Sequence, residues 1–364
     1  MHLRHLAVAA ALVACTAESV AEPTNEGNET PRGKSSKAPD GADAGAPAPS
    51  GGPGVAVADP NTCTAGDPFD PVPLHATLAY LASKELVGRS PGSAGDKASR
   101  AFIEKQFTCL GIAPAGVNGT FQQPFTDTDN NASANILGMI KGTGNDIVFV
   151  GAHQDHFGDQ KGKLLLGAND NASGVTAVLA VAKAIKQLGV APKRTIVFAI
   201  WNSEEAGCEG SHYFVDRGGL PHLPIANVVH AVNFDMVGTY TQINKTVEAH
   251  GTMTGSPSNT IMKSLLAKPG ALAGVHLNVP GLGEDDSDYW PFCAKGIPIT
   301  GFFTDDPACY HKACDTEEKI DYANLGKIAK LGSELIADLA TTATDLAAFR
   351  KSAKAANLGC GDAD

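Results

Sequence analysis

Histidines and carboxylates follow several apolar runs of this chain in a pattern that could bind metal. His153 and Asp155 follow one run, Glu204 and Glu205 follow another, and Asp235 closes a third. Neutral imidazole and carboxylate oxygens are both zinc ligands. Each of these groups by itself would more often be a polar surface turn. A metal site is indicated because such groups recur at the ends of successive apolar runs.

Two further groups extend this pattern. Asp170 stands before a predicted helix, where a single carboxylate is usually a cap. Tyr310 and His311 lie between Cys309 and Cys314. A Cys-x4-Cys pair could itself bind metal, but zinc-binding cysteines usually come as two close pairs, and no second pair is found. Carboxylate and imidazole without thiolate suit hydrolytic zinc, and the ligands suffice for two bridged zinc ions about 3.5–4 Å apart.

The elements that must position these residues alternate between helix and strand. Apolar periodicity predicts helices over residues 74–86, 98–110, 173–188, 259–266 and 316–339. Apolar runs predict strands over residues 136–140, 146–151, 195–201, 228–234 and 297–303. This alternation favours a single α/β domain with a mostly parallel central sheet and helices on both faces. Ligands of such sheets lie beyond the carboxyl ends of the strands, where the polar groups of this chain occur.

Charge and hydropathy exclude two classes of protein. The 364-residue chain has a net charge of −11 and a pI near 5.4, which disfavours a nucleic-acid partner. No apolar run reaches the roughly 20 residues that a bilayer-spanning helix needs, so a polytopic membrane protein is excluded.

The first 67 residues differ in composition from the rest. Residues 1–14 predict a signal peptide, in which Arg4 precedes a short apolar stretch, and Leu12-Val13-Ala14-Cys15 resembles a bacterial lipobox. Acylation of Cys15 would anchor the protein to a membrane, at the outer membrane or cell surface. The alternative is an ordinary secretory signal, and either one predicts an extracytoplasmic location where disulfides are permitted.

Three segments follow the predicted signal. Residues 15–67, rich in Ala, Pro and Gly, predict a disordered tether. Residues 68–350 form the predicted folded domain and residues 351–364 a C-terminal tail. Within the domain, a local disulfide between Cys309 and Cys314 is predicted, because it would stiffen the loop that carries His311.

Five motifs in a fixed order carry a family resemblance. The chain resembles the secreted di-zinc aminopeptidases of peptidase clan MH, which include bacterial leucyl aminopeptidase, aminopeptidase Y and glutamate carboxypeptidase II. The resemblance implies their zinc-exopeptidase (phosphorylase/hydrolase-like) fold over about residues 70–340. The motifs are His153-x-Asp155, Gly167-Ala168-x-Asp170-Asn171-Ala172-Ser173-Gly174, Glu204-Glu205-x-Gly207, Asp235-Met236-Val237-Gly238 and Tyr310-His311-x-x-x-Asp315.

The resemblance implies a complete set of metal ligands. His153 and Asp235 would hold one Zn²⁺ ion, Glu205 and His311 would hold the other, and Asp170 would bridge the two. Relatives have a cis peptide after the bridging aspartate, so the Asp170–Asn171 peptide is expected to be cis.

The resemblance also implies residues that act beside the ions. Asp155 would orient His153, and Asp315 would do the same for His311. Glu204 would be the general base that takes a proton from a metal-bridged water and gives it to the leaving amine. Tyr310 would donate to the oxyanion of the tetrahedral intermediate.

The predicted function is hydrolysis of the N-terminal residue from peptides with a free N-terminus. Carboxylates outnumber basic residues around the five motifs, as binding of an ammonium group requires, whereas a carboxypeptidase needs a basic cluster, usually of arginines. A glutaminyl cyclase, which shares the fold but uses one zinc ion, and a carboxypeptidase remain as alternatives. A binding module with a decayed site is disfavoured because no ligand is replaced.

Overall fold

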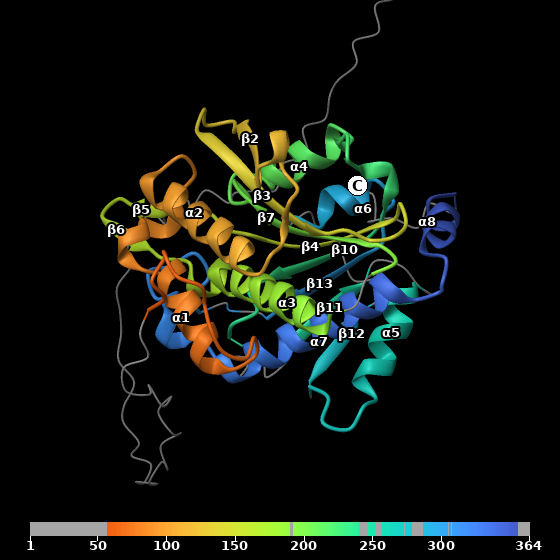
Figure 1. The fold of residues 1–364 in the computed structure, drawn as a ribbon. Coiled ribbons are helices and arrows are strands. Elements are labelled where there is room, and N and C mark those ends of the chain that lie inside the picture. Colours follow the sequence, from red (N-terminus) through yellow and green to blue (C-terminus); the bar gives the residue numbers. More distant parts are fainter. Residues whose placement is uncertain are drawn as a thin grey trace, which may run out of the picture.

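A nine-stranded sheet crosses the molecule, and helices pack on both of its faces (Figure 1). The computed structural model describes residues 57–189, 192–239, 247–251, 256–272, 274–278, 287–304, 306 and 308–355. The strand order across the sheet is β1 (Ala113–Pro114), β3 (Ala132–Ile140), β7 (Thr195–Trp201), β4 (Ile147–His153), β10 (Val228–Asp235), β13 (Ile299–Phe303), β11 (Val247–Gly251) and β12 (Val275–Asn278). Strand β2 (Gln122–Thr126) pairs with β3 outside this row.

The four central strands of the sheet are parallel, antiparallel pairings flank them on both sides, and the edge pair β11–β12 is parallel again. Strands β7, β4, β10 and β13 are neighbours and run parallel. Strand β3 is antiparallel to β7, β1 and β2, and β11 is antiparallel to β13. A turn of residues 127–131 joins β2 to β3, and so short a connection allows only antiparallel pairing. The predicted parallel sheet is therefore confirmed at the centre, within a mixed sheet.

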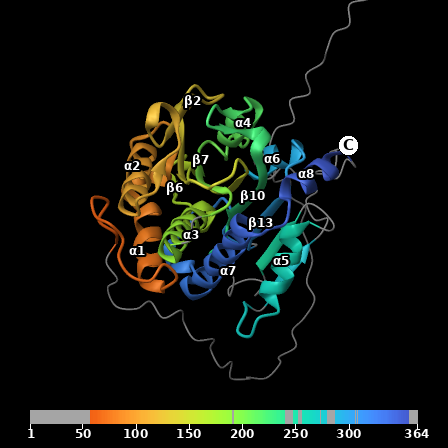
Figure 2. The ribbon, with the colours of Figure 1, turned by 45° about the vertical axis from the view of Figure 1, so that its right-hand side comes forward.

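The central strands are apolar throughout because both faces of the sheet are covered. On β4, Val148 and Val150 belong to one buried cluster, and Phe149 belongs to the opposite one. The first cluster includes residues of α1 (Pro71–Leu81), α2 (Ala94–Cys109), α3 (Gly174–Leu188), α5 (Pro257–Leu266) and α7 (Tyr322–Thr341). The second includes residues of α4 (Glu209–Asp216) and α6 (Trp290–Ala294), which lie across the sheet (Figure 2). Helix α8 (Leu346–Ala355) follows α7.

Two of the predicted helices have different bounds in the structure. The predicted helix over residues 316–339 begins later, as α7, because the Asp321 side chain accepts from the Asn324 N–H. The predicted helix over 74–86 ends at Leu81 in α1, and the chain then turns through positive φ values at Val87 and Gly88.

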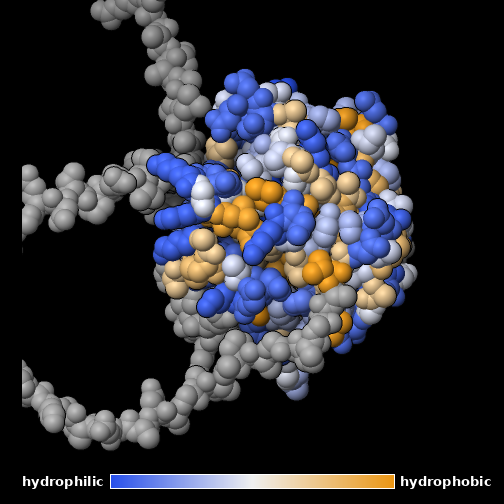
Figure 3. Space-filling model, turned by 90° about the vertical axis from the view of Figure 1, so that its left-hand side faces the viewer, coloured by the Kyte–Doolittle hydropathy of each residue, from blue (hydrophilic) through white to orange (hydrophobic). Residues whose placement is uncertain are grey.

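Among the helices that the structure describes, none is both long and apolar enough to cross a membrane. On the face shown in Figure 3, apolar side chains lie in separate patches between hydrophilic ones. Among the residues that the structure describes, the large apolar side chains that are exposed are Val57, Val72, Val87, Leu188 and Tyr310. The predicted signal peptide and residues 15–56 of the predicted tether lie outside the described residues.

Candidate metal centre

The predicted ligands meet at the carboxyl ends of the parallel strands. His153 is the last residue of β4, and Asp235 is the last residue of β10. Glu205 follows β7, Asp170 lies just before α3, and His311 lies in the loop that follows β13. All five side chains are therefore positioned by the parallel core of the sheet, as the rule for ligand sites in α/β sheets predicts.

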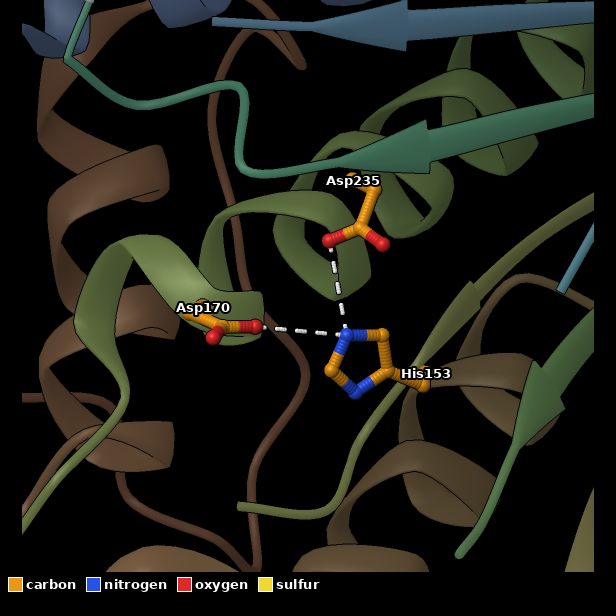
Figure 4. Close-up of side chains that lie close together, drawn as sticks. All are labelled: His153, Asp170 and Asp235. Atoms are coloured by element: carbon orange, nitrogen blue, oxygen red, sulfur yellow. Dashed lines mark ion pairs between the residues drawn. The ribbon is translucent and has the colours of Figure 1, made fainter. Parts of the chain in front are cut away.

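One ligand cluster joins β4, β10 and the start of α3 (Figure 4). The His153 Nε2 atom lies 3.3 Å from Asp170 Oδ1 and 3.4 Å from Asp235 Oδ1. Two ligand atoms on one tetrahedral zinc ion, each bonded at about 2.0–2.1 Å, are separated by about 3.3–3.4 Å. Both separations from His153 therefore match the spacing of two ligands of one zinc ion, and the ligand atoms of the three residues lie within 4.8 Å of one another.

A second cluster uses the other oxygen of Asp170. The His311 Nε2 atom lies 3.2 Å from Asp170 Oδ2 and 3.3 Å from Glu205 Oε2. These separations again match a tetrahedral edge of about 3.3 Å. Asp170 thus turns Oδ1 to one histidine and Oδ2 to the other, as a carboxylate that bridges two ions would.

Two buried oxygens of the clusters accept no hydrogen bond from any described residue. They are Asp170 Oδ2 and Asp235 Oδ1. Each of them faces a histidine nitrogen at 3.2–3.4 Å without a hydrogen bond to it, and a bound cation would offset the cost of burying that oxygen. Oxygen and imidazole donors, the tetrahedral spacing and the orphaned oxygens together fit zinc.

His156 is a site residue that the sequence analysis missed. Its Nδ1 atom lies 2.5 Å from Glu205 Oε1 and 3.8 Å from Asp170 Oδ2, and its side chain is fully buried. His156, Asp170 and Glu205 also form a group that could hold a metal ion. The available signal was a second histidine directly after the His153-x-Asp155 motif.

Asp155 holds the backbone of the loop that carries Glu204 and Glu205. Its Oδ1 accepts from the Glu204 N–H at 3.1 Å, and its Oδ2 accepts from the Glu205 N–H at 3.3 Å. His153 Nδ1 lies closer to the Asp155 backbone oxygen, at 3.2 Å, than to Asp155 Oδ1, at 3.8 Å. Asp155 therefore orients His153 mainly through its carbonyl, while its carboxylate fixes the two glutamates.

Asp315 acts on a different loop from the one predicted. Its Oδ1 accepts from the Asn169 N–H at 2.7 Å, and its Oδ2 accepts from the Asp170 N–H at 3.0 Å. Asp315 was expected to orient His311, but in the structure it holds the backbone of Asn169 and Asp170 instead. Burial raises the pKa of the Asp315 carboxyl to about 6.

A buried arginine ties the same loops together. Arg89 is fully buried and donates to the carbonyls of Gln154, Leu166 and Gly167, at 2.6–2.9 Å. Gln154 separates His153 from Asp155, and Gly167 precedes Asp170 in the next loop, so one guanidinium holds both loops. Desolvation lowers the pKa of Arg89 to about 10, and the nearby carboxylates oppose that shift.

Gly167 is required at its position. Its φ is +62°, and a Cβ there would lie 2.1 Å from the Asp170 backbone oxygen and 2.6 Å from His156 Cγ. The peptide between Asp170 and Asn171 is cis, which confirms that prediction.

Glu204 lies at the first cluster without filling a ligand position. Its Oε2 is 3.7 Å from His153 Nε2, and its Oε1 is 3.5 Å from the Cys208 Sγ donor. Burial raises the pKa of Glu204 well above its usual range; Asp235 adds to the increase, and His153 opposes it. A carboxylate beside the ligand positions that is not itself a ligand can act as a general base.

Tyr310 and His311 share one short disulfide loop. The predicted bridge between Cys309 and Cys314 is present. The Tyr310 ring stacks on the His311 ring with centroids 3.7 Å apart, and about half of the Tyr310 residue is exposed. Tyr310 is thus next to the second cluster and open to solvent, where it could meet a substrate. Its role as an oxyanion donor stays a prediction.

Comparison with known proteins agrees with this geometry. The model of peptidase family M28 matches residues 135–336. Leupeptin-inactivating enzyme 1 of Streptomyces exfoliatus is 27% identical over 293 residues, which cover 73% of this chain and 62% of that protein. Leucine aminopeptidase 2 of Trichophyton equinum is 30% identical over 180 residues, which cover 48% of this chain and 34% of that protein. The chain thus spans less than two thirds of the length of these curated relatives.

Solved structures share the fold. The zinc aminopeptidase BSAP of Bacillus subtilis superposes with a TM-score of 0.62 at 19% identity, covering 78% of this chain and 98% of that one. Glutaminyl cyclase of Porphyromonas gingivalis superposes with a TM-score of 0.60 at 17% identity, and the match covers 75% of this chain and 100% of that one. From the family match over more than half of its length, and from the ligand clusters at the strand ends, this chain belongs to peptidase family M28.

Proposed function

We propose that this protein is a zinc-dependent aminopeptidase that holds two zinc ions and removes the N-terminal residue from peptides. The observation that carries the proposal is the position of Asp170, whose two oxygens lie 3.3 Å and 3.2 Å from two different histidines. Each histidine has its own further carboxylate, so two complete sites share one bridge. A glutaminyl cyclase with one zinc ion would not need the second of them.

The residues around the clusters supply the proton transfers. Bound zinc would polarise the scissile carbonyl and activate water for attack. Glu204, which lies beside the first cluster with Oε2 3.7 Å from His153 Nε2, would take the proton of the attacking water and hand it to the departing amine. Asp155 holds Glu204 in place through the backbone, and Tyr310, beside His311, would donate to the developing oxyanion.

The arrangement of charge favours attack at the N-terminus. Each of the five arginines that the structure describes is engaged with other partners: Arg89, Arg194 and Arg350 with backbone carbonyls, Arg100 with Asp96, and Arg217 over the Tyr213 ring. Lys312 donates to a backbone carbonyl as well. A substrate carboxylate would therefore lack the arginine clamp of a carboxypeptidase, whereas an ammonium group would meet surplus carboxylate.

Paired substrates test this direction of attack. A peptide with a free N-terminus should be cleaved at least ~10²-fold faster, in kcat/KM, than its N-acetylated form, because the acetyl group removes the charge that pairs with site carboxylates. Amidation of the C-terminus should have little effect. Equal rates on the free and acetylated peptides, with amidation abolishing both, would reassign the enzyme to the carboxypeptidases. Conversion of an N-terminal glutamine to a cyclic product would identify a cyclase.

We also propose an extracytoplasmic location, with a lipid anchor at Cys15. Two disulfides in the described residues, Cys63–Cys109 and Cys309–Cys314, support an oxidising compartment. Replacement of Cys15 by serine should move the protein from the membrane fraction to the soluble one, which immunoblots of fractionated cells would show. Unchanged fractionation would favour simple secretion.

A further inference from the structure

His156 lies against the second cluster, and two roles are open to it. It could be another nitrogen ligand of the metal, or it could hold one of the ligands in place. It is fully buried, and it comes from the loop after β4 rather than from the loop that carries His311. Its Nδ1 faces Glu205, and its Nε2 has no hydrogen-bond partner among the described residues.

The distances separate these roles. His156 Nδ1 and Glu205 Oε1 are 2.5 Å apart, which is far below the about 3.3 Å that separates two ligands of one tetrahedral zinc. A hydrogen bond from an N–H to a carboxylate oxygen brings the two atoms closer together than shared ligation of one ion does, so the contact is a hydrogen bond. The other Glu205 oxygen, Oε2, lies 3.3 Å from His311 Nε2, the spacing of two ligands. Glu205 thus turns one oxygen to His156 and the other to the metal position.

The first cluster has the same arrangement. Ser287 Oγ donates to Asp235 Oδ2 at 2.6 Å, and Asn233 Nδ2 donates to Ser287 Oγ at 2.8 Å. The remaining oxygen, Asp235 Oδ1, is the orphaned atom that faces His153. In both clusters a protein donor therefore occupies one oxygen of the terminal carboxylate and leaves one oxygen for the metal.

We propose that His156 is a positioning residue, which donates its Nδ1–H to Glu205 Oε1 so that Glu205 binds the second zinc ion through Oε2 alone. This inference rests on the proposed two-zinc function. The Nδ1–H tautomer also suits the buried Nε2 atom, because it leaves no N–H there without an acceptor. Groups that hold metal ligands in this way typically contribute 10–100-fold to metal affinity.

A matched pair of variants tests the hydrogen bond. The side-chain amide of asparagine can place an N–H where His156 Nδ1 lies, whereas leucine has nearly the same size and no donor. In His156→Leu, one of the two zinc ions should bind about 10–100-fold more weakly, and the other should keep its affinity. In His156→Asn, both affinities should stay within about threefold of the wild type. Chelator competition on the purified full chain, with the zinc content measured at each step, gives both affinities.

Each other outcome overturns the proposal. Loss of one ion from both variants would make His156 a ligand, since asparagine cannot replace an imidazole there. Unchanged affinity in His156→Leu would leave the residue without a role. A wild-type chain that binds fewer than two zinc ions would overturn the proposed function, and this inference with it. If His156→Leu does not fold, His156→Gln replaces it, because its amide extends to the Nε2 position and should weaken the same ion.

Discussion

Replacement of Glu204 by glutamine is expected to lower kcat by about 10²–10⁴-fold while both zinc ions stay bound. Glutamine keeps the shape of the side chain but cannot take up the proton of the attacking water. The zinc ions should remain because Glu204 Oε2, 3.7 Å from His153 Nε2, lies beyond the spacing of the ligand atoms. Steady-state hydrolysis of aminoacyl chromogenic substrates gives kcat, and elemental analysis of the purified variant gives the zinc content.

The neighbouring glutamate is the control for this variant. Glu205→Gln removes the charge from a carboxylate whose Oε2 is 3.3 Å from His311 Nε2, so it should weaken the binding of one zinc ion. The two adjacent substitutions should therefore separate loss of turnover from loss of metal. If Glu204→Gln kept near-normal kcat, or if it lost zinc while Glu205→Gln did not, the roles of the two glutamates would be wrongly assigned.

Burial on both faces made the centre of the fold predictable. Strand β7 (Thr195–Trp201) has its predicted bounds because every residue in it is buried, which produces an unbroken apolar run. Strands β1 and β2 lie at the antiparallel edge, where they are short or only partly buried, and the sequence analysis did not identify them. The strand order was also beyond prediction, since β3 and β4 follow each other in the chain and yet β7 lies between them.

The sequence indicated which residues meet at the site, but it did not indicate which atoms each of them contacts. The strand ends and the family motifs indicate which side chains meet, because parallel strands bring their carboxyl ends to one edge. They do not show how each loop bends beyond the strand. Asp315 therefore clamps the backbone of Asp170 instead of reaching His311, and Glu205 divides its two oxygens between His156 and the metal position.

The backbone of the site is held independently of its metal ligands. Asp155 and Asp315 each accept two successive backbone N–H groups, and Arg89 donates to carbonyls of two ligand loops. These contacts do not use the ligand side chains themselves. A single ligand can therefore be replaced with the loops still held, which makes ligand substitutions a fair test of metal binding.

Replacement of Asp170 by asparagine is expected to remove both zinc ions, and activity with them. Asparagine offers one neutral oxygen, and its amide nitrogen cannot replace the second carboxylate oxygen as a ligand. Both sites thus lose charge, and one of them also loses its bridging ligand. Loss of a group that only hydrogen-bonds to a metal ligand can lower metal affinity by roughly 100-fold, and loss of the bridging ligand itself should lower each zinc affinity by more than that. Zinc content after dialysis at a fixed free zinc concentration measures the effect.

Asp235→Asn is the matched control, because Asp235 belongs to the first cluster alone. It should weaken one zinc ion and leave the other. The Asp170 backbone N–H is held by Asp315 in either variant, so circular dichroism and the thermal midpoint of the zinc-free proteins should agree with those of the zinc-free wild type. Retention of one zinc ion at wild-type affinity in Asp170→Asn would show that Asp170 binds a single ion, and the bridged pair would have to be abandoned.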